Sequence, residues 1–500
     1  MQLLKSNIDA LVAAFLGMLL VLLLTQHSGL GISPDSIYYM SAADSFLAGK
    51  GFYQFDDQPF VMFPVFYPFT LSIIKGIAGG AFISVAPYLN AVLFGTSIFL
   101  SGRILEKAGM EKRIKWTLLL VIATSASLLE VYTMLWSETL FITEILVFVW
   151  VSEKYLSIPN TKHLWVMALV AAIAAATRLA GVSVIATGGL LVLLNPRVNW
   201  GNKLKQVFVY GGIAISLFAI NLLRNAQLSQ TLTGNRQKGV TPFVENLHYY
   251  GAVLSDWLPF SNGLNRMATW LGLAFILSLA ILFIYRVWNK TTMHSFEKIV
   301  AAFTLMYSLF MLTVATISRF ETLNNRLLSP FYITFILTLG FYFADCFKWI
   351  GNGIGKRILG ITAFCIALSM FSENTKVNLS TYQENKEGGI GGYSDDDWLI
   401  SSGLLNYLVA NPAFFKTPHP IYSNAAHAVY FRTGQHLQIL PERKYPDLVK
   451  SFNEKPSQIL IWFNEEDNAE VLTLEEVAAV KNLQILSKFN DGVVYLCTSK

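Results

Sequence analysis

Long blocks of apolar residues, separated by short polar segments, recur along the chain as far as about residue 372. Many of these blocks approach about 20 residues, the length of helix that crosses a hydrocarbon layer of roughly 30 Å. Helices satisfy their own backbone hydrogen bonds, which a lipid environment requires. We therefore expect about eleven membrane-spanning helices, over residues 8–25, 81–100, 116–135, 138–151, 164–177, 179–194, 206–223, 268–285, 299–317, 327–344 and 358–371.

Two segments near the N-terminus predict helices that lie along the membrane surface. The stretch SPDSIYYMSAADSFLAGKG begins with a capping serine and a proline, Ser33 and Pro34, and ends at the glycines Gly49 and Gly51, which is typical of a short capped helix. The stretch PVFYPFTLSIIKGIAGG, residues 64–80, is short and interrupted by proline, lysine and glycine. We expect it to form a half-buried helix at the outer surface.

The pattern changes near Ser372, where the apolar blocks end. The segment DDDWLISSGLLNYLVANP predicts a helix that ends before Pro412. Three later segments, PIYSN, ILIWFN and LQILSKFNDGVVYLC, predict strands, and the last of them folds back at Asn490-Asp491-Gly492. We expect an all-α membrane domain over residues 1–372 and an α/β soluble domain over residues 373–500.

Composition agrees with a polytopic membrane protein. Apolar residues make up 54% of the 500 residues, charged residues only 14%, and the mean hydropathy is +0.48. A soluble chain usually carries about a quarter charged residues, so a soluble enzyme, a disordered chain and a β-barrel are all disfavoured. The three cysteines, which lie far apart without a CxxC pair, give no reason to expect a disulfide or a zinc site.

Charge predicts the orientation of the chain. Residues 1–372 hold 26 Lys and Arg against 16 Asp and Glu, whereas residues 373–500 hold 11 against 16. Cytoplasmic loops are enriched in Lys and Arg, so the basic cluster at residues 103–115 is expected inside and the acidic loop at residues 26–62 outside. This assignment predicts a multi-pass plasma membrane protein with a cytoplasmic N-terminus and an external, periplasmic or extracellular, C-terminal domain.

Ionisable residues gather at the helix ends that this topology places outside. Such groups are costly near a bilayer unless they have a partner or a wet cavity, so they indicate a functional site. Several arginines with a few acids suit an anionic headgroup and a nearby hydroxyl that loses a proton. The residues concerned are Asp35, Glu130, Glu138, Arg178, Arg224, Arg236, Lys238, Arg319, Glu321 and Arg326.

Each candidate also has a simpler interpretation. Asp35 and Glu138 both stand in the first turn of a predicted helix, where an acid complements the helix dipole. Arg178, Arg224 and Arg326 could extend to external lipid headgroups, as lone arginines at helix ends do. Convergence of three or more of these arginines on one face would favour the functional interpretation.

The order of several motifs resembles the GT-C class of polytopic glycosyltransferases, which contains protein O-mannosyltransferases and the lipid A aminoarabinose transferase. The first loop, SPDSIYYMSAADSFLAGKGF followed by PVFYP, resembles the first external loop of that class. The resemblance extends over most of residues 1–345 through the motifs WSETLF, ATRLAGVSV, LLRNAQLSQT and NNRLLSPFYITFIL.

The resemblance implies inverting transfer of a hexosyl or pentosyl group from a polyprenyl-phosphate-linked sugar to a hydroxyl or amine of a glycan, lipid or protein acceptor. It implies that Asp35 is the general base, that Glu138 shapes or polarises the acceptor site, and that Arg326, Arg224 and Arg178 bind the donor phosphate. Ser36 departs from the Asp-Glu pair common in protein mannosyltransferases, which puts that subgroup in doubt.

Membrane lipids are the other expected partners, and no nucleic acid is. No cofactor is expected, because no Asp-x-Asp motif lies on a predicted external loop of residues 1–372, although a divalent metal stays open. A transporter or flippase of a lipid-linked saccharide is the main alternative. Transporters tend to place polar residues at the bilayer midplane, often in repeated halves, whereas here they gather at one surface. A non-catalytic membrane scaffold is a third interpretation.

Overall fold

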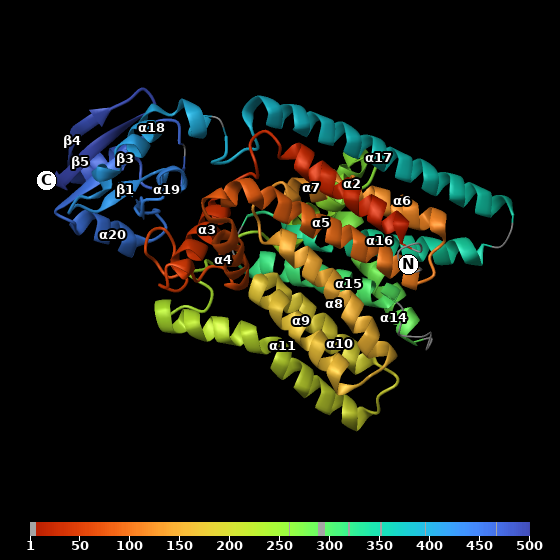
Figure 1. The fold of residues 1–500 in the computed structure, drawn as a ribbon. Coiled ribbons are helices and arrows are strands. Elements are labelled where there is room, and N and C mark those ends of the chain that lie inside the picture. Colours follow the sequence, from red (N-terminus) through yellow and green to blue (C-terminus); the bar gives the residue numbers. More distant parts are fainter. Residues whose placement is uncertain are drawn as a thin grey trace. The chain divides into compact units, whose positions relative to one another are not determined.

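The computed structural model describes residues 7–259, 261–288, 296–318, 321–350, 353–395, 397–466 and 468–500. The fold is mostly helical and has one small sheet near the C-terminus (Figure 1). The chain divides into two compact units. The first contains Met1–Gln26, Val61–Tyr67 and Ile83–Gln383, and the second contains His27–Phe60, Pro68–Phe82 and Glu384–Lys500.

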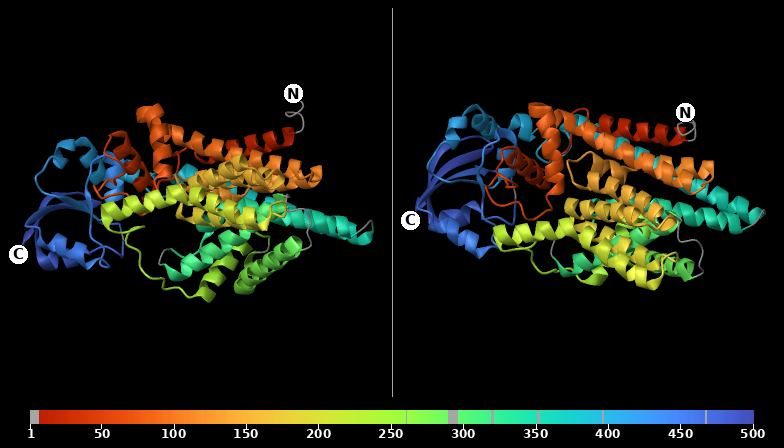
Figure 2. Two further views of the ribbon diagram at one scale, coloured as in Figure 1. Left: turned by 90° about the horizontal axis from the view of Figure 1, so that it is seen from below. Right: turned by 60° about the horizontal axis from the view of Figure 1, so that its bottom comes forward.

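The first unit is a bundle of helices that run roughly side by side (Figure 2). A helix lies over every apolar block that the sequence predicted as a span, which confirms these blocks as helical. The helices are α2 (Ile8–Leu24), α5 (Phe82–Lys107), α6 (Lys112–Ala123), α7 (Ala126–Tyr132), α8 (Glu138–Ser157), α9 (Thr161–Thr177), α10 (Val182–Leu194), α11 (Trp200–Ser229), α12 (Phe243–Asp256), α13 (Ser261–Leu264), α14 (Ala268–Trp288), α15 (Phe296–Ile317), α16 (Asn325–Trp349) and α17 (Ile354–Gly388).

Within the described residues, six helical segments are long and apolar enough to cross a membrane. The pair α6 and α7, bent by 47°, would add a seventh, and α2, α9 and the segment Leu179–Leu194 are apolar but shorter. The chain is therefore a multi-pass membrane protein, and the number of about eleven spans stays a prediction. The six segments are Phe66–Lys107, Trp200–Ser229, Asn265–Trp288, Phe296–Ile317, Asn325–Trp349 and Ile354–Gly388.

Small residues allow close packing around α9. This helix packs against α8 on one side and α11 on another, and its buried face is built largely from alanines. The turn that follows is tighter still, because a Cβ atom on Gly181 would lie 2.4 Å from the Ala174 carbonyl oxygen. Only glycine fits that approach, which explains the sharp turn between α9 and α10.

A buried group of charges joins the first helix to its neighbours. The Lys115 ammonium on α6 lies 2.9 Å from the Asp9 carboxylate on α2 and 2.6 Å from the Glu106 carboxylate on α5. Lys115 and Asp9 are both almost fully buried. A buried charge is tolerated only when it is paired, so these contacts fix how α2, α5 and α6 meet.

The C-terminal part of the second unit is an α/β structure, as the sequence predicted. Its sheet has the strand order β2-β1-β3-β5-β4, with β1 parallel to β2 and β3, and β5 antiparallel to β3 and β4. Phe452 and Val477 from two helices join the core on this sheet. The elements are β1 (Ile421–Ser423), β2 (Gln438–Ile439), β3 (Ser457–Phe463), β4 (Lys481–Lys488), β5 (Gly492–Ser499), α18 (Gly403–Ala410), α19 (Ala426–Thr433), α20 (Pro446–Glu454) and α21 (Leu474–Val480).

The three predicted strand segments are confirmed, as is the fold-back before Gly492. The predicted helix over residues 395–411 is shorter than expected. A π-helical turn, Asp397–Ser401, comes first, and α18 begins only after Ser402, whose hydroxyl accepts a hydrogen bond from the Leu405 amide. Serine is a strong N-cap, so it sets the start of the helix.

The first loop belongs to the same unit as the C-terminal sheet. It contains α3 (Pro34–Leu47) and most of α4 (Phe66–Ala78), the two surface helices that the sequence predicted, and both are confirmed as helices. The Asp44 carboxylate on α3 lies 2.6 Å from the Lys75 ammonium on α4 and accepts a hydrogen bond of 3.1 Å from the Tyr430 hydroxyl on α19. The predicted domain boundary at residue 372 falls inside α17 and stays a prediction.

An aromatic cluster strengthens this association. The His427 ring on α19 stacks on Tyr393 and meets the edges of Tyr38 on α3 and Phe55 in the first loop. Burial lowers the pKa of the His427 imidazole to about 4, because its charged form would lose solvation. The histidine is therefore neutral at pH 7, where it packs as an aromatic ring.

We expect the second unit to lose stability as the pH falls from about 6.5 to about 4, since the unfolded histidine binds a proton in that range and the folded one does not. The loss is about 3 kcal/mol at most. His427→Phe should remove this part of the pH dependence, and His436→Phe, which changes an exposed histidine, should leave it. Urea unfolding of the full chain, followed by tryptophan fluorescence at pH 4.5 and 7, measures the difference. An unchanged pH dependence in His427→Phe would contradict the assignment.

Candidate functional site

The buried carboxylate of Glu138 is the centre of a polar cluster in the first unit. Glu138 is the first residue of α8, and its side chain has no exposed surface. The chain reaches it through a tight turn in which the Thr139 hydroxyl donates to the Trp136 carbonyl oxygen. A fully buried carboxylate requires compensating charge, so its partners define the site.

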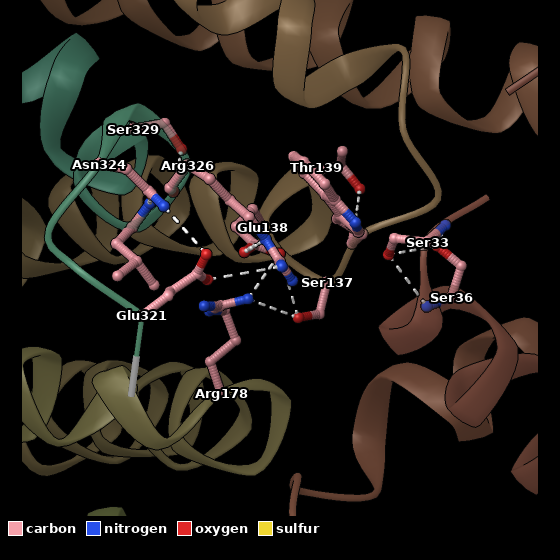
Figure 3. A network of polar contacts seen from close by, with 12 residues as sticks. Ser33, Ser36, Ser137, Glu138, Thr139, Arg178, Glu321, Asn324, Arg326 and Ser329 are labelled. Atoms are coloured by element: carbon pink, nitrogen blue, oxygen red, sulfur yellow. Dashed lines mark hydrogen bonds and ion pairs between the residues drawn. The ribbon is translucent and has the colours of Figure 1, made fainter. Parts of the chain in front are cut away.

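Two arginines from distant parts of the sequence hold this carboxylate (Figure 3). Nε of Arg326 donates to Oε1 of Glu138 at 2.7 Å. Arg178 approaches the other oxygen, Oε2, at 2.5 Å, and also donates to the Ser137 hydroxyl at 2.8 Å. Both carboxylate oxygens are therefore engaged, and both arginine side chains are largely buried, with 15% exposed.

Local backbone structure explains why the two arginines point to Glu138. Arg178 is an extended residue between α9 and the single helical turn Leu179–Gly181, so it stands at the corner where the chain changes direction. Arg326 is the second residue of α16, which begins after the N-cap Asn324. Two helix N-termini, those of α8 and α16, thus bring their positive dipole ends to this cluster.

Aromatic and polar groups border Arg326. Its guanidinium carbon lies 4.1 Å from the centre of the Trp136 ring, a cation–π contact. On another side, its NH1 nitrogen lies 3.8 Å from the Glu321 carboxylate, which also accepts a hydrogen bond of 3.0 Å from the Asn324 side-chain amide. Two arginines and two carboxylates therefore meet here, and only Glu321 of the four is substantially exposed.

A second set of contacts holds the start of α16. The Asn325 side-chain amide donates to the Glu130 carboxylate at 2.6 Å, and its oxygen accepts from the Trp257 indole at 2.8 Å. It also donates to the backbone oxygen of Ser127 on α7. These contacts fix the helix turn that carries Arg326.

Asp35, the predicted base, lies in the second unit at the start of α3 (Figure 3 shows the neighbouring serines). Ser33 and Ser36 form a capping box, and Pro34 occupies the first helical turn, as the sequence indicated. Asp35 is half-buried. The hydrogen bonds that cap the helix start come from Ser33 and Ser36.

Comparison with solved structures shows the fold of this chain, whereas comparison of its sequence finds no match. Neither a protein-family model nor a curated protein sequence matches the chain. Its structure is similar to the crystal structure of ArnT from Cupriavidus metallidurans in the apo state, with a TM-score of 0.56 over 99% of this chain and 97% of that one, at 12% identity. The structure of the same ArnT bound to undecaprenyl phosphate gives a TM-score of 0.54 over 99% and 98%, at 10% identity.

The chain has a GT-C-like fold. The sequence resemblance predicted this fold, and the similarity over nearly the whole of both chains confirms it. The similarity of fold assigns no role to an individual residue.

The structure brings together three of the five predicted site residues. Glu138, Arg178 and Arg326 are in direct contact. Arg224 on α11 donates to Asn225, whose amide in turn holds the backbone oxygens of Val61 and Leu232. The roles of all five stay predictions. Arg319, a further candidate, lies outside the described residues.

Sequence reasoning missed the residues that surround the cluster. Trp136 and Ser137 stood in the motif WSETLF but received no role, and Asn324 and Asn325 were part of NNRLLSPFYITFIL. The Asn324-Asn325-Arg326 order was a usable signal, because asparagine before an apolar helix is a common N-cap. The partner of Asn325, Trp257, follows an amphipathic helix, α12, that the apolar pattern did not predict.

Proposed function

We propose that this chain is a membrane glycosyltransferase that moves a sugar from a polyprenyl-phosphate carrier to an acceptor hydroxyl or amine. The observation that carries the proposal is the pair of arginines on Glu138 within a GT-C-like fold. An ArnT structure with a similar fold was obtained with bound undecaprenyl phosphate. Converging guanidinium groups suit a phosphate, because each can donate two parallel hydrogen bonds.

In this proposal Arg326 and Arg178 bind the phosphate of the carrier, and Arg224 adds positive charge. Breaking the bond between the anomeric carbon and the phosphate oxygen leaves the electron pair, and hence negative charge, on the departing phosphate. Donors fixed in place before the reaction stabilise that charge at little reorganisation cost. The buried contacts of both arginines with Glu138 supply this fixation.

Glu138 acts on the donor side of this reaction. Its two oxygens accept from two different arginines, so the carboxylate sets the spacing of the guanidinium groups. A carboxylate held in this way is a weak base, since protonation would break both ion pairs. We therefore assign it a positioning role, which differs from the acceptor-polarising role that the family resemblance implied.

Asp35 is the proposed general base. It takes the proton of the acceptor hydroxyl or amine while the acceptor atom forms its bond to the anomeric carbon, and the carrier phosphate leaves from the opposite side. This single displacement inverts the configuration at the anomeric carbon, and its transition state carries positive charge on the sugar. The transferred group is a hexose or a pentose.

The remaining expectations complete the proposal. The distribution of Lys and Arg predicts a cytoplasmic N-terminus and an external C-terminal domain. The compactness of the chain and its resemblance to the GT-C class favour the plasma membrane of a bacterium. The acceptor is then a glycan, lipid or protein of the cell envelope.

Purified protein in lipid nanodiscs and in vesicles tests the activity against the flippase alternative. The probe is undecaprenyl phosphate linked to radiolabelled hexoses or pentoses. Release of undecaprenyl phosphate with transfer of the label supports a transferase. Movement of the intact donor across vesicles without its cleavage would overturn the proposal.

Arg326→Lys tests the donor site directly. Lysine keeps the charge but loses the planar fork, so we expect the affinity for undecaprenyl phosphate to fall about tenfold. Binding to undecaprenol, which lacks the phosphate, should not change. Arg113→Lys, at an exposed position of α6, is the matched control. Equal affinities for undecaprenyl phosphate in Arg326→Lys and the wild type would contradict a role of Arg326 in phosphate binding.

A further inference from the structure

Arg326 contacts two carboxylates that differ in how firmly they are held. Glu138 is fully buried and hydrogen-bonded to Arg326 at 2.7 Å. Glu321 is 50% exposed, and its carboxylate lies 3.8 Å from NH1 of Arg326, which is an ion-pair distance longer than a hydrogen bond. The two acids thus take different sides of one guanidinium group.

The difference decides which acid an incoming anion can replace. Removing Glu138 would leave two buried guanidinium groups without their counter-ion, which is strongly unfavourable. The ion pair with Glu321 contributes less, because water solvates the half-exposed Glu321 carboxylate when it separates, while Glu138 keeps Arg326 paired. Glu321 is therefore the displaceable partner of Arg326.

The second contact of Glu321, with Asn324, also supports its displacement by an anion. The Asn324 side chain has two tasks: its oxygen accepts from the Leu327 amide as the N-cap of α16, and its amide nitrogen donates to Glu321. The cap holds Asn324 in place whether or not Glu321 is there. An N–H of Asn324 and the NH1 group of Arg326 therefore both face the position that the Glu321 carboxylate occupies.

We propose that Glu321 is an internal substitute for the carrier phosphate: its carboxylate occupies the phosphate position on Arg326 and Asn324, and the phosphate of the donor displaces it. This inference rests on the proposed function, in which Arg326 binds that phosphate. A planar carboxylate and a tetrahedral phosphate both accept from the same guanidinium and amide donors. The exchange keeps Arg326 paired in both states.

The exchange has a consequence for affinity. Every carrier molecule that binds must compete with a carboxylate covalently attached to the same chain, so the apparent affinity is lower than the site alone would give. A lower affinity for the phosphate also eases release of the spent carrier after transfer. Glu321 then weakens binding of the carrier phosphate and speeds its release after transfer.

Glu321→Gln tests this inference. Glutamine keeps the size and the contact with Asn324 but removes the negative charge, so undecaprenyl phosphate should bind about two- to fivefold more tightly in nanodiscs. Undecaprenol should bind as it does to the wild type. Glu321→Ser, a second variant at this half-exposed position, should show the same gain. Glu373→Gln, which breaks an exposed ion pair on α17, is the matched control and should show none.

A double variant shows whether the gain acts through Arg326. In an Arg326→Gln background, Glu321→Gln should no longer tighten binding of undecaprenyl phosphate. Unchanged or weaker binding in Glu321→Gln, while the wild type still prefers undecaprenyl phosphate to undecaprenol, would overturn the inference alone. If the wild type shows no preference between these two lipids, the proposed donor site itself is wrong and the inference falls with it.

Discussion

Asp35→Asn is expected to reduce sugar transfer by about 10²- to 10⁴-fold, the usual contribution of one positioned general base. Asparagine has the same shape but cannot accept the acceptor proton. The affinity for undecaprenyl phosphate should stay close to that of the wild type, since the residues proposed to bind the phosphate are arginines and Asp35 is not among them. Transfer of labelled sugar and binding of undecaprenyl phosphate, measured on the same nanodisc preparations, separate the two effects.

The alternative role of Asp35 is to stabilise the dipole of α3, and the chain contains a matched control for it. Helix α20 also begins with proline followed by an aspartate, Asp447, which is exposed. Asp447→Asn removes the same type of helix-dipole interaction, worth about 0.3 to 1 kcal/mol, without touching the proposed chemistry. Transfer by Asp35→Asn above about a tenth of the wild-type rate would refute its role as base.

Glu138→Gln is expected to lower the free energy of unfolding by about 3 to 5 kcal/mol. The substitution leaves two largely buried guanidinium groups facing a neutral amide, whose nitrogen cannot accept from either. Both arginines should then lose their fixed positions, so binding of undecaprenyl phosphate should weaken as well. Denaturant unfolding in detergent micelles and lipid binding at low temperature measure the two consequences.

The exposed pair of Glu373 and Lys376 on α17 gives the comparison for Glu138. Because both side chains are more than half exposed, Glu373→Gln should change stability by less than about 0.5 kcal/mol. A small effect of Glu138→Gln, similar to that of Glu373→Gln, would show that the carboxylate does not hold the arginines.

The helices were predictable because each apolar block interacts with lipid and core over its whole length. Local signals were equally reliable: Pro34 and the serines around it begin α3, as the capping pattern predicted. The helix α12 was missed because its mixture of polar and apolar residues, around Tyr249 for example, breaks the long apolar run that marked the other helices.

The contacts of the site were only partly predictable. The sequence indicated that Glu138, Arg178 and Arg326 lie at helix ends, but it gave no register between α8, α9 and α16. Which arginine reaches which carboxylate depends on that packing. Glu138 and Glu321 differ in how firmly they hold Arg326 because one is buried and the other half-exposed. Residue type alone does not predict that difference in burial.

The least predictable feature was which segments of the chain make up the second unit. The change in composition near Ser372 marked a separate tail, yet the tail packs with the first loop through Tyr430, Asp44 and the rings around His427. Such contacts join residues almost four hundred positions apart. No local pattern in either segment predicts them.

This discontinuous unit has a consequence for how the protein is made. A ribosome releases residues 27–60 and 68–82 early, but their partners in the unit, Glu384–Lys500, emerge only after the long run of helices that belongs to the first unit. The helix that bears Asp35 must therefore wait for the last strand before it reaches its final surroundings. A chain that stops just after α17 keeps every apolar helix and still lacks the partners of the first loop, so the proposed base would not reach its final surroundings.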